Sequence, residues 1–206
     1  MVAIIDYGVG NLFSLYSSLR AVGAEAEVTS DREKIKSADR LILPGVGAFG
    51  DAAEKLKTSG IDVLIKEQAA EGKPLLGICL GMQLLFDRSF EFGEHEGLGL
   101  IHGDVIPMAG NTPSGLKIPH IGWNSLRLKG RNALFSGINN GDFVYFVHSY
   151  YADRCDNSVI ATTDYGIPIT AAAASGNVYG CQFHPEKSGK TGLAILSAFC
   201  GSEVTK

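Results

Sequence analysis

A cysteine in a glycine-flanked turn is the first residue of the chain whose setting suggests chemistry. Gly77 and Gly81 lie two positions before and two positions after Cys79. This is the spacing of a nucleophile elbow, a sharp strand-to-helix turn that strains the central residue and leaves no space for neighbouring Cβ atoms. The same place is a helix N-terminus, where the dipole favours a thiolate and the backbone N–H of Leu80 can bind an oxyanion. We interpret Cys79 as a nucleophile, and a buried structural cysteine is the alternative.

A thiol nucleophile needs a base, and the base needs a group that orients it. His184, Pro185 and Glu186 follow a strand predicted over residues 177–183. In an extended chain, side chains two positions apart project to the same side, so Glu186 can reach the imidazole. The spacing therefore predicts a Cys79–His184–Glu186 triad. A metal site made from the same three residues is disfavoured because the chain has no CxxC or HxxxH pair, and we expect no metal and no cofactor.

A second glycine-containing loop, residues 44–47, follows a buried strand predicted over residues 40–43. Ligands of parallel sheets bind at the carboxyl ends of the strands, where this loop and the elbow can lie side by side. The two glycines of the loop allow its backbone to turn an N–H toward a tetrahedral oxyanion, which would complete the hole begun by Leu80. An ordinary strand-to-helix turn is the alternative.

Alternating strands and helices must hold these loops in place. In the first half, the hydrophobic pattern predicts strands over residues 2–6, 26–29, 40–43 and 73–78, and helices between Asn11 and Gly23, over 32–38, over 48–70 with an interruption at Gly60, and over 82–86. In the second half it predicts strands over residues 99–101, 104–106, 124–128, 143–150, 158–163, 168–174 and 177–183, and a helix over 192–199. We therefore predict an α/β fold in a single domain, residues 1–206, with a largely parallel central sheet, flanking helices and added antiparallel strands.

Composition limits the class of protein. The 206 residues include 18 Lys and Arg against 22 Asp and Glu, a formal net charge of −4. A hydrophobic content of 45% with 19% charged residues excludes a disordered chain, and the mild acidity argues against nucleic-acid binding. The sequence shows no signal peptide, no apolar run of membrane-spanning length and no dense framework among its four cysteines. We expect a cytoplasmic protein with no membrane or nucleic-acid partner.

The motifs together resemble those of a known family. Residues 77–83 and 184–186 are similar to the motifs of the class I, triad-type glutamine amidotransferases. Further segments resemble the branch of this family that supplies ammonia for the synthesis of imidazole glycerol phosphate in histidine biosynthesis: residues 6–12, 44–50, 120–124, 145–150 and 182–188. The resemblance runs from the first predicted strand to the last helix and implies the three-layer fold of the family. Another class I glutaminase subunit is the alternative.

The resemblance also implies a role for each matching residue. Cys79 would attack the side-chain amide of glutamine and form a γ-glutamyl thioester, His184 would move the protons, and Glu186 would hold the imidazole. The other implied roles are an oxyanion loop at Val46 and Gly47, glutamine recognition by Gln83, Glu91 and the backbone of His148, Ser149 and Tyr150, and contact with the partner, where ammonia leaves, at Trp123, Tyr145 and Lys187. Glu91 has a rationale of its own, because a carboxylate suits the α-ammonium group of the substrate.

A separate partner is the last implication of the resemblance. In this branch of the family, a cyclase subunit with a (β/α)8-barrel fold receives the ammonia in a 1:1 heterodimer and makes imidazole glycerol phosphate and AICAR. Nothing in the 206 residues resembles such a barrel, so we expect one half of an enzyme. A cysteine hydrolase on a similar elbow and a non-catalytic relative are alternatives. The intact triad and the His-Pro-Glu motif disfavour both.

Overall fold

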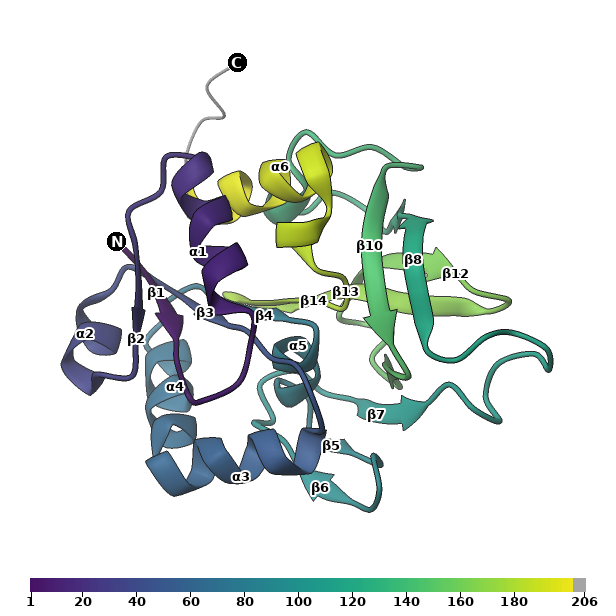
Figure 1. Ribbon diagram of the computed structural model, residues 1–206, viewed down its shortest axis with the longest axis horizontal. Coiled ribbons are helices and arrows are strands. Elements are labelled where there is room, and N and C mark those ends of the chain that lie inside the picture. The colour runs from purple at the N-terminus through teal and green to yellow at the C-terminus, as the bar shows by residue number, and fades with distance from the viewer. Residues whose placement is uncertain (202–206) are drawn as a thin grey trace.

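A computed structural model describes residues 1–201 of the chain (Figure 1). Its main sheet has eight strands in the order β2-β1-β3-β4-β14-β13-β12-β9. Neighbours from β2 to β14 pair in parallel, and neighbours from β14 to β9 pair antiparallel. In chain order the strands are β1 (Val2–Ile5), β2 (Ala26–Thr29), β3 (Arg40–Leu43), β4 (Leu75–Ile78), β9 (Arg127–Leu128), β12 (Val159–Asp164), β13 (Pro168–Ser175) and β14 (Val178–Cys181).

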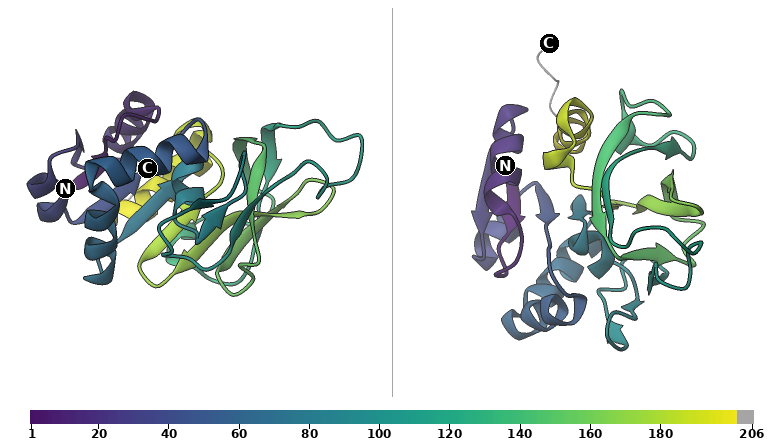
Figure 2. Two further views of the ribbon diagram at one scale, coloured as in Figure 1. Left: turned by 90° about the horizontal axis from the view of Figure 1, so that it is seen from below. Right: turned by 45° about the vertical axis from the view of Figure 1, so that its right-hand side comes forward.

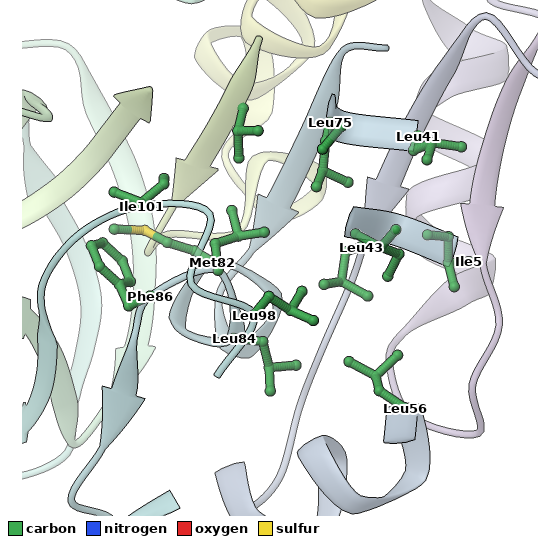
Figure 3. Close-up of a cluster of buried hydrophobic side chains, with 14 of the residues drawn as sticks. Ile5, Leu41, Leu43, Leu56, Leu75, Met82, Leu84, Phe86, Leu98 and Ile101 are labelled. Carbon is green, nitrogen blue, oxygen red and sulfur yellow. The ribbon is translucent and has the colours of Figure 1, made fainter. Parts of the chain in front are cut away.

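Helices cover both faces of the parallel strands. Side chains alternate along each strand, so Ile5 and Leu43 enter one apolar cluster (Figure 3) and Ile4 and Ile42 enter another on the opposite face. The first cluster is covered by α3 and α4, and the second by α1 and α6 (Figure 1). Because both faces of β1 and β4 are buried, these two strands are continuous hydrophobic runs. The helices are α1 (Leu12–Ala21), α2 (Arg32–Ser37), α3 (Phe49–Ser59), α4 (Ile61–Ala70), α5 (Leu80–Leu84) and α6 (Gly189–Cys200), with the 3₁₀ helices η1 (Ala133–Phe135) and η2 (Pro185–Lys187).

Two smaller sheets lie alongside the antiparallel part of the main sheet (Figure 2). One pairs β8 (His120–Ser125) with β10 (Phe143–His148). The other has the order β11-β7-β5-β6 and contains β11 (Tyr150–Asp153), β7 (Asp104–Pro107), β5 (Arg88–Ser89) and β6 (His95–Glu96). The backbone N–H of His184 donates to the Tyr145 carbonyl oxygen at 2.9 Å, which ties β10 to the segment after β14. Among residues 1–201, no helix is both long and apolar enough to cross a membrane.

The three-layer α/β arrangement with a mostly parallel sheet is confirmed, and so is the interruption at Gly60. Gly60 has a φ of 67°, a left-handed conformation that separates α3 from α4. Four predicted elements are wrong in detail. The segment predicted as a strand over 99–101 is an irregular bend, and the strand predicted over 143–150 is broken at Ser149 into β10 and β11, which belong to different sheets. The strand predicted over 124–128 begins earlier and is divided at residue 126, and the helix predicted over 82–86 begins directly after Cys79.

Candidate active site

Cys79 occupies the strained turn between β4 and α5. Its φ of 54° and ψ of −112° form a backbone conformation that residues with a Cβ rarely adopt. A Cβ on Gly81 would lie 1.8 Å from the Leu43 carbonyl oxygen, and one on Gly77 would lie 2.6 Å from the Gly81 carbonyl oxygen. Both glycines are therefore required by close backbone contact, as the elbow spacing predicted.

This crowding leads to a stability prediction. We expect Gly81→Ala to destabilise the fold by about 3 kcal/mol or more in urea unfolding, because the backbone of β3 or α5 must shift. Gly72 is a matched control, because it has a φ of 88° but nothing within 4 Å of the position of a Cβ. Gly72→Ala should cost only the strain of positive φ, about 1 kcal/mol. Equal losses in the two variants would mean that the close approach at the elbow has no energetic weight.

His184 and Glu186 form a buried pair beside the elbow. The Nδ1 of His184 lies 2.8 Å from Oε1 of Glu186, and both side chains are less than 5% exposed. The predicted contact is present, but the extended chain from which it was predicted is not. Residues 185–187 form the 3₁₀ helix η2, and its turn brings the carboxylate back to the ring. Since a carboxylate only accepts, Nδ1 carries the proton, and Nε2 of His184 is left without a hydrogen-bond partner in residues 1–201.

The charge balance at this pair favours a protonated imidazole. Burial alone lowers the pKa of His184, but the neighbouring Cys79 sulfur and Glu186 carboxylate outweigh it and raise the pKa to about 9. Near neutral pH, His184 can therefore hold the proton of the thiol while Glu186 fixes the ring. This arrangement is that of a thiol nucleophile with an oriented base.

A cavity of about 320 Å³ opens at Cys79 and collects most of the predicted site residues. Its wall contains Cys79 and His184 together with Val46, Gly47, Leu80, Gln83, Glu91, His148, Ser149, Tyr150 and Lys187. Pro119 and Val147 also line it and were not predicted. Glu186 lies behind His184, and Trp123 and Tyr145 lie outside the cavity wall. No group of three or more His, Cys, Asp or Glu residues suited to a metal is present in the described part of the chain.

The glycine loop lies against the elbow, as predicted. A Cβ on Gly45 would lie 2.7 Å from the backbone nitrogen of Gly81. The Tyr7 hydroxyl donates to the Pro44 carbonyl oxygen at 2.8 Å, and burial together with the nearby Cys79 raises the pKa of Tyr7, so the donor keeps its proton. Gly47 has a φ of 96° and open space around it. The start of the loop is therefore fixed, and Gly47 is the position that is free to turn.

Gln83 and Glu91 both have structural partners that the sequence did not predict. The Nε2 of Gln83 donates to the Tyr150 carbonyl oxygen and to Oε1 of Gln182, both at 3.0 Å, which leaves its own amide oxygen for a ligand. One carboxylate oxygen of Glu91 accepts from the backbone N–H of Phe49 at 2.6 Å, at the start of α3. The residue before this helix, Ala48, provides no side-chain cap. This absence was the signal in the sequence that another residue must cap α3.

An exposed apolar face lies on β8 and β10, outside the cavity. Trp123 is paired with Tyr145 across the two strands, and their rings meet edge to face with centroids 6.0 Å apart. Ile121, Trp123 and Phe143 are each more than half exposed. The residues between them on β10, Val144 and Phe146, are buried in the core. Large aromatic and aliphatic side chains gathered on one side of a sheet are typical of an interface with another protein.

Comparison with known proteins identifies sequence relatives along the whole chain. The family described as glutamine amidotransferase class-I matches residues 3–200. Proteins named imidazole glycerol phosphate synthase subunit HisH are among the sequences similar to this chain. The protein from Caldanaerobacter subterraneus subsp. tengcongensis is 53% identical (97% of each chain covered), and that from Bacillus cereus strain G9842 is 51% identical (98% of this chain and 94% of that one). The protein from Wolinella succinogenes is 48% identical (97% and 98%).

Solved structures share the fold at lower sequence identity. A structure titled crystal structure of glutamine amidotransferase has a TM-score of 0.76 at 20% identity, covering 98% of this chain and 100% of that one. A structure titled PurLQS from Thermotoga maritima has a TM-score of 0.75 at 21% identity, covering 97% of each chain. These structural similarities concern the fold alone. The relatives of about 50% identity all come from one branch of the family, the HisH subunits.

Proposed function

Because the chain belongs to the class I glutamine amidotransferases, we propose that it is the glutaminase subunit of imidazole glycerol phosphate synthase. In this role it hydrolyses L-glutamine and supplies the ammonia for the synthesis of imidazole glycerol phosphate and AICAR in histidine biosynthesis. The observation that carries the proposal is the strained Cys79 at a cavity, beside a buried His184–Glu186 pair. The names and full-length similarity of the relatives support the choice of branch.

The proposed reaction proceeds in two halves. The Cys79 sulfur attacks the carboxamide carbon of glutamine while His184 holds the thiol proton on Nε2, and the new oxyanion is bound by the N–H of Leu80 and one N–H of the glycine loop. The C–N bond then breaks, His184 gives its proton to the leaving nitrogen, and ammonia departs from a γ-glutamyl thioester. In the second half, His184 takes a proton from water, which attacks the thioester. Glutamate leaves and the thiol is restored.

Substrate recognition follows from the atoms left free around the cavity. The amide oxygen of Gln83 can accept from the substrate, because both of its amide protons are already used. One oxygen of Glu91 is bound to the start of α3, and the other can pair with the α-ammonium group. We assign the backbone of residues 148–150 to the flank of the substrate, because these residues line the same cavity.

The proposed partner is a (β/α)8-barrel cyclase subunit in a 1:1 heterodimer. The exposed apolar face that contains Trp123 and Tyr145 supports an interface on β8 and β10, and Lys187 lies at the cavity wall nearby. Ammonia would leave toward this side. We also propose a cytoplasmic location, which fits four cysteines that are all unpaired.

Control by the partner is expected from the glycine loop. Free glutaminase activity wastes glutamine, and rotation of a peptide plane at Gly47 moves one N–H into or out of the oxyanion hole. Loss of one oxyanion donor typically costs about 10²–10³ in kcat. The isolated chain should therefore hydrolyse glutamine very slowly. Addition of the cyclase subunit and its nucleotide substrate should raise kcat by at least about that factor.

The variant Gly47→Val tests this control mechanism. A β-branched residue restricts the rotation, so the stimulation by partner and nucleotide should shrink while assembly, measured by analytical ultracentrifugation, is retained. Gly45 is less suitable, because any side chain there collides with the elbow itself. Full glutaminase activity of the isolated chain, unchanged by partner and nucleotide, would exclude the mechanism.

The function itself is tested by glutamate release from glutamine, measured with and without the cyclase subunit. The proposal requires glutamate release that depends on Cys79 and a complex that forms imidazole glycerol phosphate from glutamine. A chain that binds the cyclase but never hydrolyses glutamine would instead be a non-catalytic relative. Glutaminase activity with no effect on the cyclase would indicate another class I subunit.

A further inference from the structure

Gln182 is a buried side chain beside Cys79 to which neither the proposed mechanism nor the resemblance gives a role. It follows β14, directly before Phe183, and is completely buried. Its Nε2 lies 3.9 Å from Sγ of Cys79, and its Oε1 lies 3.0 Å from Nε2 of Gln83. An amide in such a position needs partners for both ends, because unpaired buried polar groups are costly. Whether the oxygen or the nitrogen of the Gln182 amide faces Cys79 therefore decides whether the sulfur meets an acceptor or a donor.

The hydrogen-bond network fixes which end of Gln182 faces the sulfur. The Tyr150 carbonyl oxygen can only accept, so the atom of Gln83 that faces it at 3.0 Å must be the amide nitrogen. The same nitrogen contacts Gln182 and must donate there as well, so Gln182 presents its oxygen to Gln83. Its amide nitrogen is then directed at Cys79.

A second buried residue, His148, fixes the direction of the hydrogen bonds at the Tyr150 end of this network. The Nδ1 of His148 lies 2.9 Å from the Tyr150 carbonyl oxygen and donates to it. Burial lowers the pKa of His148 to about 3, so the ring stays neutral, and its Nε2 accepts from Nδ1 of His120 at 3.0 Å. With donors from His148 and Gln83, both lone pairs of the Tyr150 carbonyl are occupied. The orientation of Gln83, and through it that of Gln182, cannot reverse without leaving a buried group unpaired.

The groups that face the Cys79 sulfur include two titratable side chains, His184 and Tyr7, and the sulfur raises the pKa of each. A backbone carbonyl on another side of the sulfur gives the Gln182 donor its role. The Val147 carbonyl oxygen lies 3.9 Å from Sγ and accepts from the thiol, an interaction that favours the protonated form. A thiolate loses that bond and faces the negative end of the carbonyl instead. An N–H from Gln182 favours the charged form and offsets the carbonyl.

We propose that Gln182 directs an amide N–H at the Cys79 sulfur and stabilises the thiolate before substrate is attacked. The role rests on the proposed function only because it takes Cys79 as the nucleophile. In this role, the hydrogen bonds that run from His148 through Tyr150 and Gln83 serve to orient the amide N–H of Gln182.

The pH dependence of Cys79 alkylation by iodoacetamide, followed by peptide mass spectrometry, tests the proposal. Gln182→Met removes the donor and keeps the length of the side chain. It should move the pH profile of Cys79 alkylation to higher pH and slow alkylation near neutral pH by about tenfold, the size of one hydrogen bond to a charged group. Gln182→Asn keeps an amide but withdraws it from the sulfur, so it should shift the profile in the same direction.

Gln68→Met is the matched control. Gln68 is also buried and donates to Glu71, but it lies on α4, away from the cavity, so its replacement should leave the profile unchanged. If Gln182→Met does not fold, the pH profile of Gln182→Asn tests the proposal in its place. A folded Gln182 variant with the wild-type pH profile, or an equal shift in Gln68→Met, overturns the proposal. The assay uses neither glutamine nor the partner, so a wild-type chain without glutaminase activity would contradict the proposed function and leave this measurement valid.

Discussion

Replacement of Cys79 with alanine should reduce glutamine-dependent turnover of the complex by on the order of 10⁶-fold, the loss that follows removal of a nucleophile from a triad. The proposed synthase chemistry lies in the other subunit and needs only ammonia. Added ammonium salts should therefore still support formation of imidazole glycerol phosphate by the Cys79→Ala complex. The measurement compares product formation from glutamine with product formation from ammonium.

Cys200→Ala provides the control for this prediction. Cys200 is partly buried at the end of α6 and takes no part in the cavity wall, so the variant should keep wild-type glutamine-dependent turnover. Retained glutaminase activity in Cys79→Ala would reject the covalent mechanism. Loss of the ammonium-dependent reaction as well would mean that the cyclase subunit in the preparation is itself inactive, since that reaction needs only ammonia.

His184→Ala should show the second largest loss, about 10⁴-fold in kcat, because both the base for the thiol and the acid for the leaving nitrogen are removed. Glu186→Gln should lose less, about 10²-fold, because the imidazole remains at the sulfur and only its orientation and charge support are weakened. Glutamine hydrolysis by the activated complex measures both.

The ranking of these two variants has a structural basis. Glu186 reaches only Nδ1 of His184, and its other carboxylate oxygen has no hydrogen-bond partner within residues 1–201, so its influence passes through the ring. The Glu186→Gln amide can still accept at Oε1 from the ring N–H. A larger loss for Glu186→Gln than for His184→Ala, in variants with equal melting temperatures, would contradict this assignment of roles.

The parallel half of the fold could be predicted because its signals are local. The short apolar run that ends at Pro44 and Gly45 corresponds to β3, and Asn11 accepts from the Ser14 backbone N–H at the start of α1 as a capping residue should. The errors lie where tertiary contacts decide. Residues 143–150 are one continuous strand by pattern, yet the chain leaves one sheet for another at Ser149, where the Ser149 carbonyl oxygen accepts from Met108. A single sequence contains no local sign of that change.

The candidate site shows the same division. The spacing of Gly77 and Gly81 around Cys79 predicts the elbow, because a close backbone approach excludes every other residue type at the two glycine positions. The contact of His184 with Glu186 was predicted from an extended chain, and the short 3₁₀ turn that produces it was not foreseen. The position of Gln182 depends on residues about 30 and 100 positions away, Tyr150 and Gln83, so only the folded chain could reveal which end of its amide faces the sulfur.

Stoichiometric labelling with an electrophilic analogue of glutamine shows whether Cys79 is the nucleophile. The intact complex is incubated with the analogue, residual glutaminase activity is recorded, and the four cysteines are mapped by peptide mass spectrometry. We expect one equivalent of label on Cys79, loss of activity in proportion to labelling, and protection by excess glutamine. Inactivation with the label on Cys155, Cys181 or Cys200, or full labelling of Cys79 with activity retained, would contradict this expectation.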